Sequence, residues 1–553
     1  MKLNKLNIGI ICLVMTANVH LLAQITERPR PEEWKQIVDG GRFIDRFLPM
    51  VSGTLSKDTW GAEGVIPRYI DNGIENAQFS FWGGNILRGD DNKYHLFVCG
   101  WPESSPKGHH EWPNSTVYHA VCDNSIGPFL VKDALGKGHN PEIFRLRDGR
   151  YVVYVIDGRY VSDNINGEWT YGKFDFNTRG RNIIEGLSNL TYTRREDGSY
   201  LMVCRGGGIW ISETGLSPYN QLTDKRVYPP VEGYFEDPVV WRDHVQYHLV
   251  VNDWLGRIAF YLRSKDGINW VVDPGEAYTP GISKHEDGYV EDWFKYERMK
   301  VFQDEYGRAI QANFAVIDVL KNDDKPNDNH NSKNISIPLN PGLLLSLIDT
   351  QPITTATKTI HLKIAAEKGF NPHTDINLAS LRFGASTEVN FGRGSKAIRS
   401  EKSGADLIVT FEAAGNGITA DEFAPKLIGK TSQGKLLYGY TRLPYVNYIE
   451  PILSALMPIF TLRVDGLDLN VEVQNFGQVA SQESTLKLTV EIDGKNTAVG
   501  NGIVPALRPF EKNNVWLTSK SVFEKGKEYA FTLNILSKGK IASTYQFKTI
   551  PIK

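Results

Sequence analysis

One pattern of strands and turns recurs five times between residues 80 and 320, and this repeat constrains the fold more than any other feature of the chain. Each recurrence has an alternating strand, a polar turn and an aromatic-rich strand; the five begin at Asn85, Asn140, Asn189, Asp237 and Arg298. Short alternating segments separated by Asp-Gly or Asn-Gly turns are typical of antiparallel meanders. One meander cannot bury both of its faces, so we expect five of them to pack radially as the blades of a β-propeller. A single stacked sandwich is the alternative, but it does not explain why one motif recurs.

The repeat stops near residue 340, and strictly alternating strands continue to the end of the chain. Segments such as 359–364 and 406–411 form one group, and 467–473, 485–494 and 529–535 form another. Alternation of this kind is typical of small β-sandwiches. We therefore predict an all-β protein: a five-bladed β-propeller over residues 24–345, followed by two small β-sandwich (immunoglobulin-like) domains over 346–455 and 456–553.

The first residues resemble an export signal. Lys2 and Lys5 precede the apolar run 8–15, and a small residue, Ala23, follows at a suitable distance for cleavage. The run is shorter than the roughly 20 residues that a membrane-spanning helix needs, and no later stretch is long and apolar enough to be an anchor. We predict a signal peptide over residues 1–23 and a secreted or periplasmic protein with no transmembrane segment.

Composition narrows the function classes. The formal net charge is −2, so no general attraction to nucleic acid is expected. Beyond the signal the cysteines are Cys99, Cys122 and Cys204, an odd and sparse set that shows neither a disulfide framework nor metal-ligand spacing. The 12 Trp, 24 Tyr and 25 Phe favour carbohydrate as a partner, because aromatic rings stack on sugar faces, although β cores also use them.

The repeats resemble the five-bladed propeller glycoside hydrolases. Repeats open with Asn140-Pro141 and Asp237-Pro238, and the third strand of one repeat closes with the segment 162–169, Ser-Asp-Asn-Ile-Asn-Gly-Glu-Trp. This is similar to the arabinanase and xylosidase group (family 43) and to the anhydrogalactosidases of family 117. The resemblance covers about residues 75–320. It implies a secreted glycosidase, exo-acting on oligosaccharides from plant or algal polysaccharide.

In the arabinanase pattern an Asp opening the first blade is the base, an Asp opening the second tunes its pKa, and a Glu before the third is the acid. Glu185 matches the third position, whereas the second is Asn140 and the first is the segment 83–85, which has no carboxylate. The resemblance therefore implies that the base has moved. We expect Asp237 to be the base and Glu185 the acid, with Glu297 binding substrate or exchanging roles.

Other readings of these acids stay open. Carboxylates at blade starts often bind backbone amides of neighbouring blades. Asp71 and Glu75 precede the first blade and are possible substitutes for the missing base, although Asp71-Asn72-Gly73 is also an ordinary turn.

A second group of residues is expected to bind substrate. Trp101 and His110 lie at and within a long insertion of the first repeat, and loops on a rigid scaffold commonly carry function. His139 or His285 is an alternative to Glu185 as the acid, and a merely hydrogen-bonded histidine is the plainer interpretation of each. Arg205 offers bidentate donors for a sulfate or carboxylate. The full set of predicted substrate-binding residues is Asn85, Trp101, His110, His139, Asn140, Arg205 and His285.

Two other functions remain open at this stage. A polysaccharide lyase would use a His or Tyr base and an Arg to neutralise a uronate, and a non-catalytic sugar-binding propeller would have lost its acids. No cofactor is expected; the resemblance allows a structural cation on the propeller axis, for which the sequence shows no ligand set.

Overall fold

The computed structural model describes residues 27–56, 67–328 and 332–552. The predicted signal peptide lies outside these residues. Nearly all regular structure is β strand, as predicted. The short helices are η1 (Glu32–Gln36), η2 (Phe43–Arg46), η3 (Gly108–Asn114), α1 (Pro372–Asp375), η4 (Leu378–Ser380) and α2 (Ser386–Val389). Among the described residues, no helix is long and apolar enough to span a bilayer.

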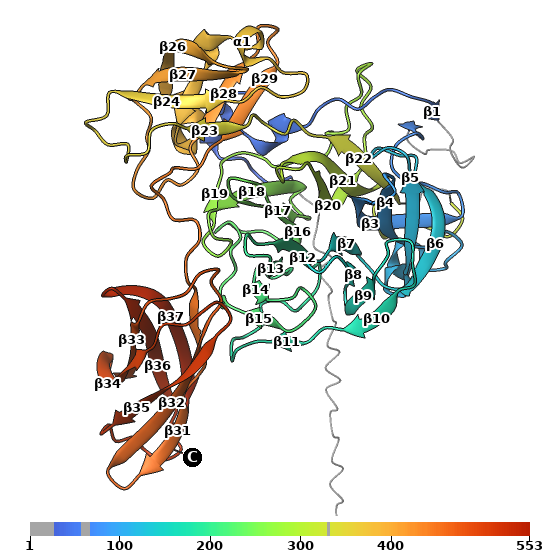
Figure 1. The fold of residues 1–553 in the computed structure, drawn as a ribbon. Coiled ribbons are helices and arrows are strands. Elements are labelled where there is room, and N and C mark those ends of the chain that lie inside the picture. The colour runs from blue at the N-terminus through green and yellow to red at the C-terminus, as the bar shows by residue number, and fades with distance from the viewer. Residues whose placement is uncertain (1–26, 57–66, 329–331, 553) are drawn as a thin grey trace, which may run out of the picture.

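Five small sheets follow one another along the chain and lie around a common centre (Figure 1). Sheet 1 contains β3 (Phe79–Arg88), β4 (Tyr94–Pro102), β5 (Thr116–Cys122) and β6 (Leu130–Lys137). Sheet 2 contains β7 (Glu142–Arg145), β8 (Tyr151–Val155), β9 (Gly158–Ser162) and β10 (Thr170–Lys173). Sheet 3 contains β12 (Thr191–Arg194), β13 (Tyr200–Val203), β14 (Ile209–Ser212), β15 (Tyr219–Gln221) and, parallel to β15, β11 (Phe176–Asn177).

Sheets 4 and 5 complete the set. Sheet 4 contains β16 (Phe235–Arg242), β17 (Tyr247–Asp253), β18 (Ile258–Ser264) and β19 (Val271–Val272). Sheet 5 contains β20 (Lys295–Gln303), β21 (Ala309–Ile317) and β22 (Lys333–Pro338). The first strand of sheet 5 packs against the first strand of sheet 1, so the sheets form a closed ring. A separate two-stranded sheet, β1 (Leu55–Ser56) with β2 (Arg68–Tyr69), precedes them.

Alternating side chains on each strand explain why the sheets pack face to face. On β8, Val153 and Val155 lie in one hydrophobic cluster with Phe97 of sheet 1. Their neighbours Val152 and Tyr154 face the other way, into a cluster with residues of sheet 3. Successive side chains of a strand point to opposite faces, so an apolar strand buries both faces only between two neighbouring sheets. The near-continuous hydrophobic run 151–155 is thus the local signal for this packing.

Residues 345–440 form a second unit. Its strands are paired in the order β23 (Leu345–Leu347), β24 (Thr359–Ile364), β27 (Asp406–Glu412), β26 (Ser395–Ser403), β25 (Arg382–Gly384), β28 (Lys426–Lys430) and β29 (Leu436–Tyr440). The pairing is one continuous path, whereas a sandwich would have two separate sheets. Both ends of the path contribute to one hydrophobic cluster, so the sheet curls over its own core.

Residues 453–549 form a third unit with two sheets. One pairs β32 (Gly466–Asn475) with β30 (Leu453–Ala455), β31 (Ile459–Arg463) and β35 (Lys512–Ser519). The other has the order β34 (Lys495–Val504), β33 (Ser484–Ile492), β36 (Tyr529–Ser537) and β37 (Lys540–Thr549). Inward residues of both sheets share one hydrophobic cluster. This unit is therefore a two-layered β structure.

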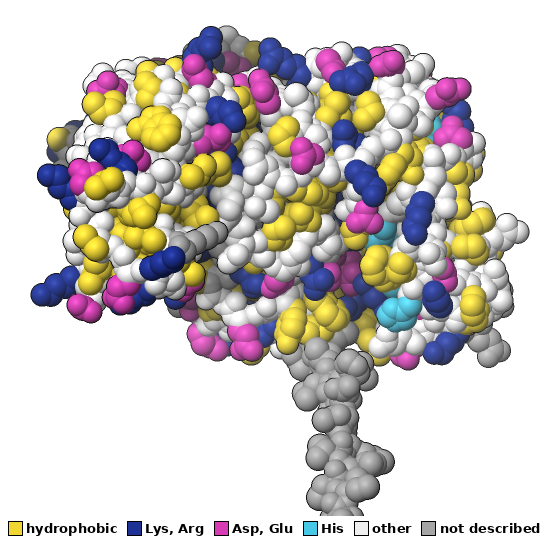
Figure 2. Space-filling model, turned by 90° about the horizontal axis from the view of Figure 1, so that it is seen from below, with side chains coloured by type: hydrophobic (Ala, Val, Ile, Leu, Met, Phe, Trp, Pro, Cys, Tyr) yellow, Lys and Arg dark blue, Asp and Glu magenta, His cyan; other side chains and the backbone are white. Residues whose placement is uncertain are grey.

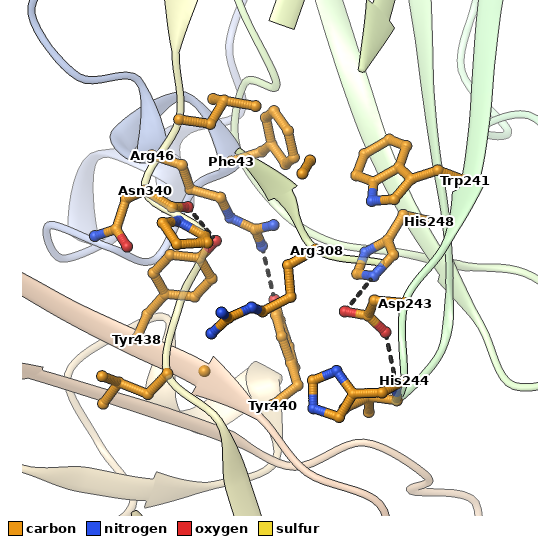
Figure 3. Close-up of a pocket in the computed structure, with 16 residues that line it drawn as sticks. Phe43, Arg46, Trp241, Asp243, His244, His248, Arg308, Asn340, Tyr438 and Tyr440 are labelled. Atoms are coloured by element: carbon orange, nitrogen blue, oxygen red, sulfur yellow. Dashed lines mark hydrogen bonds and ion pairs between the residues drawn. The ribbon is translucent and has the colours of Figure 1, made fainter. Parts of the chain in front are cut away.

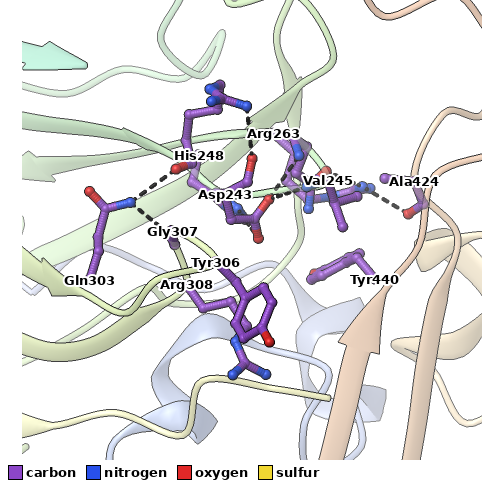
Figure 4. Close-up of polar contacts among 12 residues, drawn as sticks. Asp243, Val245, His248, Arg263, Gln303, Tyr306, Gly307, Arg308, Ala424 and Tyr440 are labelled. Carbon is purple, nitrogen blue, oxygen red and sulfur yellow. Dashed lines mark hydrogen bonds and ion pairs between the residues drawn. The ribbon is translucent and has the colours of Figure 1, made fainter. Parts of the chain in front are cut away.

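Aromatic rings enclose a buried arginine where the second unit meets sheets 4 and 5. The Arg46 guanidinium carbon lies 4.6 Å from the ring centroid of Phe43 and 4.6 Å from that of Tyr438 (Figure 3). It also lies 4.8 Å from the ring centroid of Tyr261. Such cation–π contacts are strongest where water is excluded. Nearby, Arg263 Nη1 of β18 donates to the carbonyl oxygen of Ala424 at 3.3 Å (Figure 4). These contacts hold the second unit against the ring of sheets.

Charges of both signs are interspersed over the face drawn in Figure 2, with hydrophobic side chains in small groups between them. No broad basic area is visible on that face. This agrees with the near-neutral net charge of the chain.

Candidate active site

A cavity of ≈ 920 Å³ lies where the innermost strands of the five sheets begin. A second hollow, lined among others by Asn85 and Glu142, lies toward the opposite ends of the same strands. Both hollows are lined by residues from all five repeats, and the first is the candidate active site because it contains two carboxylates with shifted pKa values, Glu236 and Glu297.

One backbone conformation recurs at the start of every innermost strand. Five residues have a positive φ there: Gly83 (62°), Asn140 (52°), Asn189 (50°), Asp237 (52°) and Arg298 (53°). Non-glycine residues rarely adopt this left-handed region, and such strain tends to persist where the surrounding structure imposes it for function. A pairing irregularity occurs at the same place in β3, β16 and β20, between Trp82 and Asn85, Glu236 and Val239, and Glu297 and Lys300. These five positions are structurally equivalent.

The residue before each of these positions lines the cavity. In chain order these residues are Trp82, His139, Ser188, Glu236 and Glu297. The left-handed turn therefore sends one side chain per repeat into the cavity. Two of the five are carboxylates, and they come from neighbouring sheets.

Hydrogen bonds link the left-handed residues into a floor beneath the cavity. Asn140 Nδ2 donates to Asn189 Oδ1 at 3.2 Å, and Asn189 Nδ2 donates to Asp237 Oδ1 at 3.0 Å. Arg298 Nη1 donates to Asp237 Oδ1 at 2.8 Å. Gly83 lies beside Asn140 in this ring of residues, so close that a Cβ atom on Gly83 would touch the Asn140 side-chain amide. The Asp237 carboxylate is thus engaged by partners within the floor.

Glu236 has the properties of a proton donor. Burial, reinforced by the charges of Asp237 and Glu297, raises the pKa of Glu236 to about 7, and the nearby guanidinium of Arg205 opposes the rise. Arg205 Nε lies 3.5 Å from Glu236 Oε1. A carboxyl group with such a pKa holds its proton near neutral pH and can release it, as a general acid must.

Glu297 has the opposite character. Burial acts to raise the pKa of Glu297, but the charges of Lys321 and Lys295 outweigh it and hold the pKa below its usual value. Lys295 Nζ lies 3.4 Å from Glu297 Oε1, and Lys321 is an ion-pair partner of the other oxygen. Glu297 therefore stays ionised, as a base or nucleophile must.

Cations and aromatic rings line the rest of the cavity. Lys295 Nζ lies 4.3 Å from the ring centroid of Trp254, and Lys321 Nζ lies 4.8 Å from that of Trp82. Arg205 and Arg257 add two further positive charges. Aromatic faces suit sugar rings, and the excess of positive charge suits a ligand that carries an acidic group.

The structure brings six of the predicted site residues to this cavity and leaves four outside its lining. Those that line it are Asp237, Glu297, His139, Asn140, Arg205 and His110. Those that do not are Glu185, Asn85, Trp101 and His285.

Glu185 is half-exposed and forms an ion pair with Arg226. It precedes Ser188, the residue of its repeat that reaches the cavity, by three positions. Asn85 binds the Ile143 backbone of sheet 2 and lines the opposite hollow. Trp101 is buried and packs against His109, with ring centroids 5.2 Å apart.

His285 also lies elsewhere. It is buried, packs against the ring of Tyr69 at 4.0 Å between centroids, and lies 3.3 Å from Glu291. Of the possible substitutes for the missing base, Asp71 accepts a hydrogen bond from the Thr54 amide, and Glu75 pairs with Lys333. Neither lines the cavity.

Two histidines that line the cavity, His109 and His139, are poor proton donors. Burial, reinforced by the charge of Arg298, lowers the pKa of His139 well below its usual value, and burial does the same to the pKa of His109. Neutral imidazoles can accept and donate hydrogen bonds to a sugar, but they hold no acidic proton to give.

The functional residue that sequence reasoning missed is Glu236. It stands next to Asp237, in the segment Phe235-Glu236-Asp237-Pro238. Asp237 and Arg298 both open repeats, so the residues before them, Glu236 and Glu297, hold equivalent positions, and grouping Asp237 with Glu297 as site acids is out by one residue. The one-residue shift matters because neighbouring residues here point in different directions, one into the floor and one into the cavity.

No protein-family model and no curated protein matches the chain. Solved structures do resemble it. An α-L-arabinofuranosidase from Lactobacillus brevis has a TM-score of 0.33 and 12% identity over 46% of this chain and 90% of its own. A protein described as a glycoside hydrolase has a TM-score of 0.36 and 9% identity over 86% of this chain and 99% of its own.

A family 43 protein, BlXynB from Bacillus licheniformis, has a TM-score of 0.30 and 9% identity over 86% of this chain and 89% of its own. The solved structures thus include family 43 glycoside hydrolases, the group that the repeats resemble. Because these TM-scores are low, the proposals below rest on the residues of the cavity and not on the similarity.

Proposed function

We propose that this protein is a secreted glycoside hydrolase whose five sheets are the blades of a β-propeller, with Glu236 as general acid and Glu297 as catalytic carboxylate. The observation that carries the proposal is the pair itself. Two carboxylates at equivalent positions of neighbouring sheets enter one cavity, and their pKa values are moved in opposite directions. Such a divergence is what assigns acid and base in hydrolytic sites. The third unit, residues 453–549, is proposed to be an accessory β domain of immunoglobulin-like type, and the second unit an accessory domain built on one curled sheet.

In the proposed reaction the Glu236 proton passes to the glycosidic oxygen as its bond to the anomeric carbon breaks. A water molecule attacks the anomeric carbon and gives a proton to Glu297. The products are a free sugar and an alcohol, and proton exchange with solvent restores both carboxyl groups. Asp237 is a positioning residue, since its carboxylate is held by Arg298 and Asn189.

The closed floor supports action at a chain end. The hydrogen-bonded residues from Asn140 to Arg298 lie under the cavity, and below them Lys300 and Glu142 form a buried ion pair. At the rim, His110 Nε2 lies 2.7 Å from Asn322 Oδ1, joining the insertion of sheet 1 to the loop after β21. A cavity with a floor and a bridged rim accepts the end of a sugar chain more readily than its middle. The cationic lining favours a terminal sugar with a carboxylate or sulfate.

The proposal is tested on a panel of neutral, uronate-containing and sulfated oligosaccharides, with reducing-end release as the readout. We expect Glu236→Gln to lower kcat on oligosaccharides by about 10²–10⁴-fold, since general acid catalysis contributes that much. A nitrophenolate leaving group needs no proton, so Glu236→Gln should lower kcat on aryl glycosides far less than on oligosaccharides. Glu213→Gln, at an exposed residue of the turn that follows β14, is the matched control and should keep full activity.

Three outcomes would count against hydrolysis by this pair. Ultraviolet absorbance of an unsaturated uronate would identify a lyase. If Glu236→Gln lowered kcat equally on oligosaccharides and on aryl glycosides, Glu236 would not be the general acid. Binding of oligosaccharides without release of any product would leave a sugar-binding propeller.

The pH profile gives a separate prediction. Since Glu236 must be protonated, kcat should fall as pH rises through about 7, the raised pKa of Glu236. Arg205 lowers that pKa, so Arg205→Gln should raise it and move the alkaline limb of kcat to higher pH. The measurement is kcat over the range from about pH 4 to about pH 9 for both proteins. An alkaline limb that stays in place in Arg205→Gln would mean that another group supplies the proton.

A further inference from the structure

Three carboxylates meet beside the cavity, outside the residues assigned to catalysis. They belong to Glu103, which follows β4, and to Asp324 and Asp328 in the loop between β21 and β22. One oxygen from each lies within 4.8 Å of the others. Glu103 and Asp324 are 6% and 5% exposed, so two of the three acids are almost completely withdrawn from water.

Two oxygens of this cluster are buried without a partner. Glu103 Oε2 accepts a hydrogen bond from Ser80 Oγ at 3.0 Å, but Glu103 Oε1 has no donor. Asp324 Oδ1 has none either. A buried acceptor without a donor costs about 1–3 kcal/mol, and more when it is charged. The arrangement is therefore unfavourable unless something fills the space between the oxygens.

The neighbouring charges make the cost larger. The carboxylates of Glu103 and Asp328 both repel a negative charge on Asp324. Asp328 likewise repels a negative charge on Glu103. The charges that act most on these two groups are negative, and a bound cation would reverse this balance.

We propose that Glu103, Asp324 and Asp328 bind a divalent cation, with Ca²⁺ as the best fit. Carboxylate oxygens are the ligands that hard cations prefer, and Ca²⁺ takes 6–8 of them at about 2.3–2.6 Å. Two oxygens on opposite sides of Ca²⁺ are then about 5 Å apart, which matches the separations in this cluster. Water completes the coordination.

The site would fix the rim of the cavity. Gly108 begins η3 five residues after Glu103, and it packs so closely on the Asp324 carbonyl that a Cβ atom would collide with it. His109 and His110 follow on that side, and Lys321 lies three residues before Asp324 on the other. A cation joining Glu103 to Asp324 therefore holds Lys321 near Glu297. This consequence for activity rests on the proposed function; cation binding does not.

The test is isothermal titration calorimetry of CaCl₂ into the full-length protein after treatment with a chelator, without any sugar. We expect one Ca²⁺ per chain, and a thermal midpoint that rises with Ca²⁺ concentration, because a ligand that binds only the folded state stabilises it. Asp324→Asn should abolish both effects. Asp323→Asn, the exposed neighbour, should behave like the wild type.

Loss of folding would not hide the answer. Asp324→Asn keeps the size of the side chain and removes the repulsion between Asp324 and the carboxylates of Glu103 and Asp328, so without Ca²⁺ it should be at least as stable as the wild type. Undiminished Ca²⁺ binding by Asp324→Asn, or no heat and no change in midpoint for the wild type, would overturn the site and leave carboxyls that share protons. A larger rise of the thermal midpoint with MgCl₂ than with CaCl₂ would overturn the choice of Ca²⁺. None of these results depends on whether the protein hydrolyses sugars.

Discussion

Changing Glu297 to Gln should lower kcat by about 10²–10⁴-fold on every substrate that the protein cleaves, aryl glycosides included. The amide keeps the size of the side chain but cannot take a proton from water or carry the negative charge that faces the anomeric centre. Lys321 and Lys295 also lose their common partner, so two positive charges face the reacting carbon unbalanced. The measurement is kcat on an oligosaccharide and on an aryl glycoside of the same sugar.

The contrast with Glu236→Gln separates the two roles. Loss of the acid should be partly masked by a good leaving group, whereas loss of the base should not. Glu286→Gln, an exposed residue of the loop before β20, controls for a general effect of removing a carboxylate. An unchanged kcat in folded Glu297→Gln protein would show that the reacting carbon lies elsewhere.

The second large effect is on stability, at the ion pair of Lys300 and Glu142 beneath the cavity. The two side chains are 3% and 6% exposed and come from sheets 5 and 2. Burial lowers the pKa of Lys300, and the charge of Glu142 opposes this. Lys300→Met leaves the Glu142 carboxylate buried without its cation, and such a loss costs about 3–5 kcal/mol. Urea unfolding followed by tryptophan fluorescence measures the cost.

A double variant tests the cause. In Lys300→Met with Glu142→Gln no buried charge remains, so the double variant should be more stable than Lys300→Met alone. If the losses of unfolding free energy in the two single variants simply added up in the double variant, the lysine would stabilise the ring of sheets by packing and not by its charge. Lys93→Met, on an exposed turn of sheet 1, should change the unfolding midpoint little.

Much of the ring of sheets could be predicted because its signals are local. The run 151–155 shows β structure and burial on two faces, and the turns between strands carry Asp-Gly or Asn-Gly. The strand pattern of residues 345–440 was equally visible, but the order of pairing was not. Which strand joins which depends on side chains distant in sequence, and alternation alone does not distinguish a curled sheet from two stacked ones.

The candidate site was only partly predictable. Asp237 and Glu297 stand out as carboxylates at repeat starts, and both reach the centre of the ring. Glu185 also fits by sequence, yet it points to Arg226. The left-handed turn decides which residue of each repeat enters the cavity, and its local signal is weak. Gly, Asn and Asp, which favour positive φ, occupy four of the five positions but are common in ordinary turns, and Arg298 occupies the fifth.

The sequence by itself determined that this chain is β structure built from a repeated unit, because period and turn chemistry are properties of neighbouring residues. Only the tertiary structure decided the chemistry of the site. Burial and two neighbouring carboxylates raise the pKa of Glu236, whereas the charge of Lys321, which comes from another loop, acts to lower the pKa of Glu297. A pKa is set by what lies within a few ångströms in space, and closure of the ring brings those groups together.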